Sequence, residues 1–426
     1  MTKIRPFSAL RYNQDKIDDL SKVVCPPYDI ISPEDQDRYH AKHPFNLIRL
    51  ILGKDLAGDN QKENKYIRAA HLFNTWIKEK ILKNDEKESL YFYLQEYTIR
   101  GEKKKRLGFI SLMRLEDEEE STIFAHENTH LAPKEDRLQL LKKVRANLSP
   151  IFTLFSDEKK YINRIYDENL KNAQELISLT DQDKVSHKLW RFSEEEFINK
   201  LKKYIENRHI FIADGHHRWE VAQLYLNQIC KKRKDFDKEA GYNYILTYFT
   251  DINSKEITIL PIHRVIKKLP RSILDLSRLF DIEKIKTKED LFLFMAKAGL
   301  AEHAFGLYHD GRFFLLRLKN ERSIGNFIKG GSGDYKKLDV VLLHKLIIKD
   351  ILGIKDEDVL FIKDEDEAQD MVNQGLAEAV FFLNPTKIEQ IRSIALNNER
   401  MPPKSTFFYP KLLSGLVIHK FDEDKS

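Results

Sequence analysis

The densest group of chemically active side chains lies in one short segment, Asp214-Gly215-His216-His217-Arg218. A carboxylate, two imidazoles and a guanidinium within five positions can bind an anion or transfer a proton. Guanidinium and imidazole N–H groups suit phosphate oxygens, which arginine binds with two parallel hydrogen bonds. The segment therefore predicts an anion site in which these five residues surround a phosphate group.

The flanking sequence predicts how this segment is positioned. Residues 210–213 are wholly apolar, which is typical of a buried strand, and apolar residues from Trp219 onward recur at steps of three and four, which is typical of a helix. Asp214 is expected to cap that helix and Gly215 to permit a sharp turn. Free N–H groups at a helix start favour an anion. Two alternatives remain: a polar helix start without a ligand, and a metal site.

A second motif, His126-Glu127-Asn128-Thr129-His130, matches the H-E-x-x-H pattern of zinc proteases. That chemistry requires a long helix, which brings both imidazoles to one face. Here β-branched residues precede the motif and Pro133 follows it closely, which favours a strand leading into a loop. We expect His126 and Glu127 to be polar groups at a strand end, with Glu127 able to act as a base and both able to bind a metal ion.

Two proline-flanked segments carry further candidates. In Pro26-Pro27-Tyr28-Asp29, the Tyr28 ring can stack on a base, and Asp29 can hold a metal-bound water or act as a base. Near the other end, Lys404, Ser405 and Thr406 offer a cation and two hydroxyls to a phosphate. Each segment also has a purely structural interpretation, as a rigid turn and as the polar entry to an aromatic edge strand.

Chemical complementarity predicts that these segments converge on one cleft. The central turn lacks a flexible ammonium group, which Lys404 can supply, and Asp29 can supply a carboxylate that is free of capping. A phosphoryl-transfer site needs all three kinds of group within reach of one phosphate.

Composition limits the class of protein. The chain has 426 residues, of which 42% are hydrophobic and 33% are charged, as in soluble globular proteins. Its 72 basic and 67 acidic residues give a net charge of +5, which is too balanced to indicate nucleic-acid binding. Two cysteines cannot form a disulfide framework, no apolar run could span a membrane, and the first residues do not resemble a signal peptide. We expect a soluble, cytoplasmic protein that binds a small-molecule substrate.

Helical and strand patterns alternate along the chain, which predicts a mixed α/β (α+β) fold with mixed sheets and flanking helices. We expect an N-terminal and central region over residues 1–270 and a C-terminal region over 271–426, packed together. The individual elements expected are helices over 65–82, from Pro133 to Pro150, over 283–300, over 338–351 and over 364–375, and hairpins over 90–112 and 304–318. A glycine-rich loop is expected over 329–334.

Several of these segments together resemble a bacterial and archaeal family known as domain of unknown function 1015. The matching pieces, in chain order, are residues 5–12, Pro26–Ile31, His126–Thr129, Lys134–Arg137, Ala213–Arg218, Asn384–Thr386 and Met401–Gly415. They cover nearly the whole chain. His130 lies outside the pattern, which weakens the zinc-protease interpretation further.

The strand, the Asp-Gly-His-His-Arg turn and the helix also resemble the phosphate-binding turn of the ParB/sulfiredoxin-type fold. That resemblance covers about twenty residues. It implies a nucleotide pocket with Gly215, His216, His217 and Arg218 around the phosphates, and ATP or ADP with Mg²⁺ as cofactors. Members of that superfamily bind nucleotides at this turn, and some phosphorylate free serine.

The function expected is therefore a nucleotide-dependent phosphotransferase or phosphohydrolase that acts on a small metabolite, with an amino acid such as serine among the candidate acceptors. Arg218 and Lys404 would hold the phosphates, His216 and His217 would donate hydrogen bonds, and Asp29, Glu127 or Asp214 would bind metal or act as the base. One alternative is a nucleotide sensor or adaptor without activity. Another is a metal-dependent hydrolase centred on His126, Glu127 and the two central histidines.

Overall fold

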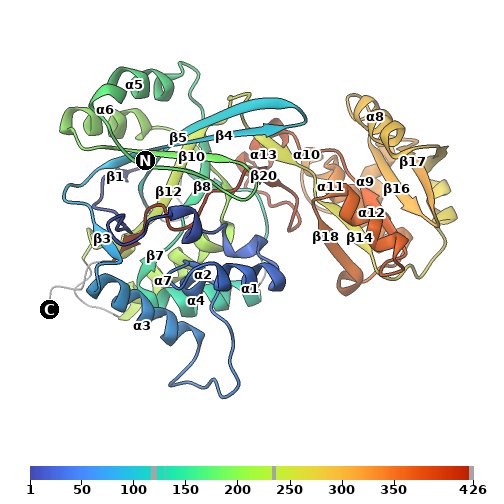
Figure 1. Cartoon of the computed structure of the whole chain (residues 1–426). Helices are drawn as coiled ribbons and strands as arrows, with labels where there is room; N and C mark the ends of the chain where they lie inside the picture. The colour runs from blue at the N-terminus through green and yellow to red at the C-terminus, as the bar shows by residue number, and fades with distance from the viewer. Residues whose placement is uncertain (117–121, 130, 233–236, 422–426) are drawn as a thin grey trace. The chain divides into compact units, whose positions relative to one another are not determined.

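The chain forms two compact units, which Figure 1 shows in a computed structural model that describes residues 1–116, 122–129, 131–232 and 237–421. Unit 1 comprises Met1–Phe124, Thr129–Ile257 and Pro410–Ser426, and unit 2 comprises Ala125–Asn128 and Thr258–Tyr409. The main division between the two units thus falls near residue 258. The last described residues, from Pro410 onward, belong to unit 1.

Unit 1 is built on a mixed sheet of nine strands, with β1 pairing with β5 and the others in the order β6-β11-β8-β12-β5-β4-β10-β9. The bounds are β1 Ile4–Arg5, β4 Leu90–Ile99, β5 Glu102–Arg114, β6 Ile123–Ala125, β8 Ile151–Phe155, β9 Gln174–Thr180, β10 Ser186–Phe192, β11 Ile210–Asp214 and β12 Tyr244–Asp251. The central strands β8 and β12 run parallel and are buried almost throughout. Such continuous burial requires helices on both faces of the sheet.

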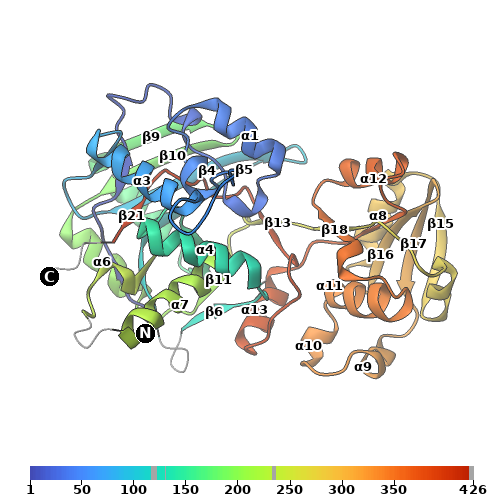
Figure 2. The same ribbon diagram turned by 90° about the horizontal axis from the view of Figure 1, so that it is seen from below.

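Helices cover both faces of this sheet. Figure 1 shows α5 and α6 on one face and α1–α4 with α7 on the other, and Figure 2 shows the second group from below. Their bounds are α1 Pro33–Lys42, α2 Ile48–Ile51, α3 Lys65–Lys78, α4 Leu131–Val144, α5 Tyr161–Asn169, α6 Glu195–Ile205 and α7 His216–Lys232. Two short pairings complete unit 1: β2 (Leu10–Tyr12) with β3 (Leu82–Asn84), and β7 (Ala146–Asn147) with β21 (His419–Lys420).

Unit 2 contains a six-stranded sheet in the order β15-β17-β16-β19-β14-β18 and a separate pair, β13 with β20. Its strands are β13 Thr258–Leu260, β14 His263–Ile266, β15 Phe280–Ile285, β16 Ala304–His309, β17 Arg312–Leu318, β18 Val359–Ile362, β19 Ala379–Phe382 and β20 Phe407–Tyr409. Its helices are α8 Lys288–Ala298, α9 Ile324–Phe327, α10 Gly333–Lys336, α11 Asp339–Val341, a π-helical stretch Leu342–Ile351, α12 Glu365–Asn373 and α13 Ile388–Leu396.

The mixed α/β class predicted from the sequence is confirmed, and so are both hairpins. Each hairpin turns through two residues with positive φ, Arg100-Gly101 and Asp310-Gly311, as a tight turn requires. Differences occur at element ends. The helix expected over 283–300 begins only at Lys288, because residues 280–285 pair with β17, and the expected helix 338–351 is mostly π-helical. No helix in the described residues is long and apolar enough to cross a membrane.

Candidate functional site

The predicted strand–turn–helix is present and forms the centre of the candidate site in unit 1. β11 ends at Asp214, Gly215 has a φ of +90°, and α7 begins at His216. A Cβ atom at Gly215 would lie 2.9 Å from Nη2 of Arg218 and 2.9 Å from Cγ2 of Ile151. Glycine is therefore needed both for the left-handed backbone and for the close approach of the guanidinium group.

The carboxylate of Asp214 belongs to an ion-pair cluster with Arg218 and Lys411. The N–H of Trp219 donates to the carbonyl of Gly215 at 3.0 Å, which places Gly215 at the cap position. Asp214 accepts from Nη2 of Arg218 at 2.9 Å and from the ammonium group of Lys411. Charged donors bind a carboxylate more strongly than backbone N–H groups do, so these two ion pairs dominate the surroundings of Asp214, and its capping of α7 stays a prediction.

This cluster is buried and stays charged. The side chains of Asp214, Arg218 and Lys411 are 12%, 14% and 9% exposed. Burial alone would raise the pKa of Asp214, but the neighbouring Lys411 and Arg218 cations outweigh it and hold the pKa well below its usual range. Asp214 is therefore ionised near neutral pH and is a poor candidate for a general base.

Lys411 reaches the cluster from a segment that is fixed on the central sheet. The amide Nε2 of Gln95 donates to the carbonyl of Lys411 at 2.9 Å, and Nη2 of Arg106 donates to the carbonyl of Pro410. Gln95 and Arg106 are fully buried and bond to each other. The backbone of Lys411 is thus held by two strands, β4 and β5, while its side chain extends to the end of β11.

Arg218 is fixed at two points. Besides its contact with Asp214, its Nη1 donates to the carbonyl of Pro150. Of the two histidines in the first turn of α7, His216 is buried and His217 is partly buried. The turn thus presents its guanidinium group in a defined orientation before any ligand arrives.

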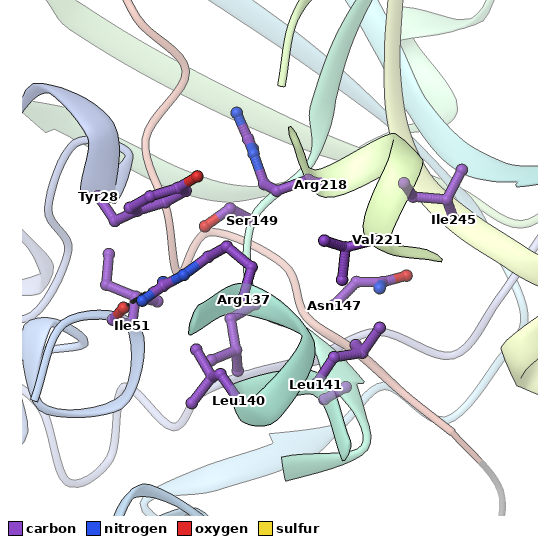
Figure 3. Close-up of a pocket in the computed structure, with 12 residues that line it drawn as sticks. Tyr28, Ile51, Arg137, Leu140, Leu141, Asn147, Ser149, Arg218, Val221 and Ile245 are labelled. Atoms are coloured by element: carbon purple, nitrogen blue, oxygen red, sulfur yellow. Dashed lines mark hydrogen bonds between the residues drawn. The ribbon is translucent and has the colours of Figure 1, made fainter. Parts of the chain in front are cut away.

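A cavity of about 70 Å³ opens beside Arg218, entirely within unit 1 (Figure 3). Tyr28, Arg137, Ser149 and Arg218 give it polar groups, and aliphatic side chains such as Leu141 form much of the remaining wall. Figure 3 shows these four polar side chains gathered toward one end. The volume accommodates a few water molecules or one phosphoryl group and lies below the ~300 Å³ at which pockets for whole small molecules begin.

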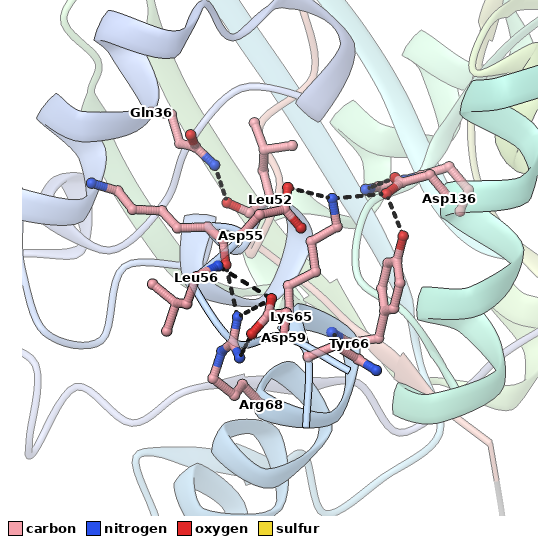
Figure 4. A network of polar contacts seen from close by, with 12 residues as sticks. Gln36, Leu52, Asp55, Leu56, Asp59, Lys65, Tyr66, Arg68 and Asp136 are labelled. Carbon is pink, nitrogen blue, oxygen red and sulfur yellow. Dashed lines mark hydrogen bonds and ion pairs between the residues drawn. The ribbon is translucent and has the colours of Figure 1, made fainter. Parts of the chain in front are cut away.

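Arg137 supplies a second guanidinium group to this cavity. Its Nε donates to Oδ2 of Asp136 at 2.8 Å, and its Nη1 donates to the carbonyl of Ile51 at 2.5 Å. Its Cζ atom lies 4.0 Å from the centre of the Tyr28 ring. Figure 4 shows that Asp136 is held in turn by the hydroxyl of Tyr66, at 2.8 Å, and by the ammonium group of Lys65, at 3.4 Å. A network of polar contacts therefore fixes Arg137.

Tyr28 and Asp29, both predicted from the sequence, lie on a single 3₁₀ turn, Tyr28–Ile30. The side chain of Tyr28 lines the cavity, and burial raises the pKa of its hydroxyl, which therefore remains a protonated donor. The side chain of Asp29 is exposed. Of the two, only Tyr28 contributes to the cavity wall.

The other predicted residues form a second group, in unit 2. The N–H of Lys404 donates to Oε1 of Glu127 at 2.7 Å, and the hydroxyl of Thr406 lies 3.2 Å from Nε2 of His126 and 3.5 Å from Oε2 of Glu127. Ser405 is buried, and its hydroxyl donates to the carbonyl of Pro402 at 2.6 Å. Segments about 280 positions apart thus meet in unit 2, and their polar groups bond to one another.

The backbone of Lys404 is held from both sides. Its φ is +59°, which is unusual for a residue other than glycine. Glu127 accepts from its N–H, and Nη2 of the buried Arg264 donates to its carbonyl at 3.1 Å. The convergence expected between this group and the Asp214–Arg218 turn stays a prediction, since the two belong to different units.

The zinc-protease interpretation is not supported. β6 ends at Ala125, and residues 126–129 are not helical, so His126 does not lie on the helix that this chemistry requires. His130 lies outside the described residues. Where the structure describes the chain, no three His, Cys, Asp or Glu side chains are grouped as a metal site would need. Asp29 belongs to unit 1 and Glu127 to unit 2, so their expected role as joint metal ligands stays a prediction.

Comparison with known families identifies the chain's relatives. Residues 4–341 match the family described as "Protein of unknown function (DUF1015)". The chain belongs to this family. The match confirms the resemblance drawn from the segments between residues 5 and 218. No curated protein matches the chain.

Several solved structures resemble this DUF1015 member at a distance. A conserved hypothetical protein from Pyrococcus furiosus aligns with 12% identity and a TM-score of 0.36, over 70% of this chain and 92% of its own. A structure described as "Free serine kinase in complex with AMP" aligns with 14% identity and a TM-score of 0.35, over 67% and 83% of the two chains. SbnI from Staphylococcus aureus, with a C-terminal truncation, aligns with 11% identity and a TM-score of 0.35, over 72% of this chain and 86% of its own.

Sequence reasoning missed three contributors to the unit 1 site. Lys411 was overlooked because the neighbouring Lys404, Ser405 and Thr406 form a more obvious phosphate-binding set. Arg137 follows an acidic residue on a helix and has the pattern of a surface ion pair. Ser149 stands beside Pro150 in a connecting segment. The one signal for Arg137 and Lys411 is that both lie in segments that match the family, Lys134–Arg137 and Met401–Gly415.

Proposed function

We propose that this DUF1015 member binds the phosphates of a nucleotide at the cavity lined by Tyr28, Arg137 and Arg218. The observation that carries this proposal is the pair of fixed guanidinium groups beside the first turn of α7. A helix start supplies N–H donors and a favourable dipole for an anion, and arginine supplies charged donors in a planar array. ATP or ADP is the proposed ligand.

The size of the cavity suits a phosphoryl group better than a nucleoside. With about 70 Å³ available, one phosphate can lie against the guanidinium groups while the base and ribose remain outside. The residues of the site would therefore fix the position of a phosphate group and leave the base and ribose without specific contacts in the cavity.

We further propose that the bound nucleotide donates or loses a phosphoryl group, with a small metabolite or water as acceptor. Such transfer needs positioning and charge stabilisation more than covalent chemistry. Arg137 and Arg218 would stabilise charge on the transferring group, and His217 would donate a hydrogen bond. Mg²⁺, when bound with the nucleotide, would neutralise phosphate charge, and one or two carboxylates suffice to hold it.

The carboxylate that would orient the acceptor is Asp29. Asp136 and Asp214 are both occupied by cations, whereas the side chain of Asp29 is exposed beside Tyr28. Glu127 is a weaker candidate, because both of its oxygens accept hydrogen bonds within unit 2. The occupation of Asp136 and Asp214 also favours a second candidate function, a nucleotide sensor without catalysis.

A ligand screen followed by a turnover assay tests both functions. Thermal melting would be recorded with ATP, ADP, AMP and pyrophosphate, each with and without Mg²⁺. Stabilisation by a nucleotide at ligand concentrations near 1 mM, lost in Arg137→Ala and retained in Arg164→Ala, would support the phosphate site. Arg164 is an exposed arginine on α5 and serves as the matched control. ³¹P NMR with a panel of amino acids and sugars then separates the transferase from the sensor, and the absence of nucleotide binding contradicts both.

A further inference from the structure

The ion-pair cluster at the end of β11 contains more cations than anions. Two cations, Arg218 and Lys411, share the single carboxylate of Asp214, so the three side chains carry a formal charge of +1. Each oxygen has its own partner, since Oδ2 accepts from Arg218 and Oδ1 from Lys411. The carboxylate thus occupies donors of the kind that a phosphate would otherwise use.

We propose that Asp214 is an internal counterion of the phosphate site, which holds Arg218 and Lys411 in place and competes with the phosphate for their charge. This inference rests on the proposed function, because it assigns to Asp214 a role within the same site. It differs from the sequence-based expectation that Asp214 binds the nucleotide or its metal ion, since it predicts the opposite effect of removing the carboxylate.

Burial gives the competition its strength. All three side chains are at most 14% exposed, so their charges interact in a medium that screens them less than water does. A phosphate placed at the guanidinium of Arg218 would lie close to the Asp214 carboxylate that this group already contacts at 2.9 Å. Repulsion between the two anions would lower phosphate affinity below what the cations alone could provide.

The cluster also has a structural role, which explains why a competing carboxylate is kept. Without Asp214, two buried cations would lack this shared counterion, and removing one partner of a buried pair is strongly destabilising. The carbonyl of Pro150 holds the guanidinium of Arg218 from the other side, and Gln95 holds the backbone of Lys411. Asp214 thus prepares the orientation of the cations at the cost of some affinity.

Binding of inorganic phosphate and pyrophosphate to the full chain tests this inference. The variants would be Asp214→Asn, Lys411→Met and, as a matched control, Asp157→Asn. Asp157 is also a buried carboxylate of unit 1, but it accepts from the N–H groups of Tyr161 and Ile162 and from the hydroxyl of Tyr204. Replacing it should destabilise unit 1 without releasing a cation.

In calorimetry, Asp214→Asn should bind pyrophosphate about tenfold more tightly than the parent chain, which is an ordinary size for coupling between charged sites. Its melting temperature should be lower without ligand and should rise more on adding pyrophosphate. Unchanged or weaker binding by folded Asp214→Asn would overturn the inference. Asp157→Asn should show the loss of stability and no gain in affinity, and a gain there would also overturn it.

Lys411→Met keeps the fold testable if Asp214→Asn does not fold. It leaves Asp214 and Arg218 as a neutral pair, so phosphate affinity should fall at least about fivefold. Unchanged affinity in Lys411→Met would contradict the inference. A parent chain that binds pyrophosphate but no nucleotide would remove the proposed function alone, because the counterion role concerns any phosphate.

Discussion

The ammonium group of Lys411 pairs with the carboxylate of Asp214, which lies 197 positions earlier in the chain. This contact joins the last segment of unit 1 to the turn between β11 and α7. It supplies the flexible cation that the Asp-Gly-His-His-Arg turn lacks by itself. Lys411 thus brings to this turn the kind of cation that the sequence analysis expected from Lys404, whose own role there stays a prediction.

Gly215→Ala should destabilise the chain more than Gly101→Ala. Both glycines have positive φ, at +90° and +80°, so both substitutions add backbone strain of about 1 kcal/mol. At Gly215 the new Cβ would also lie 2.9 Å from Arg218, whereas at Gly101 it would meet nothing within 4 Å. We expect a total loss of about 2–4 kcal/mol at Gly215 in urea unfolding. Equal losses at both positions would contradict the steric argument.

Tyr66→Phe should weaken phosphate binding although Tyr66 does not line the cavity. The hydroxyl donates to Asp136, which holds Arg137, so its loss should cost about 1–2 kcal/mol of stability and lower nucleotide affinity a few-fold. Tyr161→Phe is a suitable control, since Tyr161 contacts Tyr204 through its ring. Calorimetry and urea unfolding of both variants provide the comparison. A Tyr66→Phe variant with full affinity would show that the network does not position Arg137.

The stability of unit 2 should fall as the pH drops from about 6.5 to 4. Burial, together with the nearby Arg264, lowers the pKa of His263 from its ordinary 6.5 to about 4. In that range the unfolded chain takes up a proton that the folded chain does not, so folding loses up to about 3 kcal/mol at this residue. His263→Asn keeps an acceptor for the N–H of Leu383 and should flatten this dependence. If the free energy of unfolding, measured with urea between pH 7 and 4, depends on pH as steeply in His263→Asn as in the parent chain, then His263 is not the source of this pH dependence.

Removal of divalent metal ions should leave the fold intact. Over the described part of the chain, His, Cys, Asp and Glu side chains form no group of three or more that could hold a structural ion. The melting temperature should therefore be the same before and after dialysis against a strong chelator. A drop that Zn²⁺ alone reverses would favour the metal-dependent hydrolase that the sequence left open.

Local patterns predicted much of the fold. The 3–4 spacing of apolar residues located α3 and α12, and Asp310-Gly311 located a hairpin, because these signals depend on neighbours in the chain. The start of α8 was misplaced since residues 280–285 are recruited into a sheet by β17, a partner that periodicity does not reveal.

The site was predicted as far as its chemistry is local. The strand–turn–helix around Gly215 follows from one segment, and it is present. The partners of Asp214 and Arg218 could not be predicted from this segment, because Lys411 and Pro150 come from distant positions in the chain. For the same reason the contact between Glu127 and the N–H of Lys404 could not be predicted, and the role of Glu127 as a metal ligand stays a prediction.

The central claim is that the guanidinium groups at the Tyr28 cavity bind nucleotide phosphates. The most direct measurement is a calorimetric titration of ADP, with and without Mg²⁺, into the parent chain, Arg137→Ala and Arg164→Ala. Loss of a charged hydrogen bond should weaken binding in Arg137→Ala by about 1.5–3 kcal/mol, roughly 10- to 150-fold, and leave Arg164→Ala unchanged. Equal affinity in all three proteins, with folding confirmed by circular dichroism, would contradict the phosphate site.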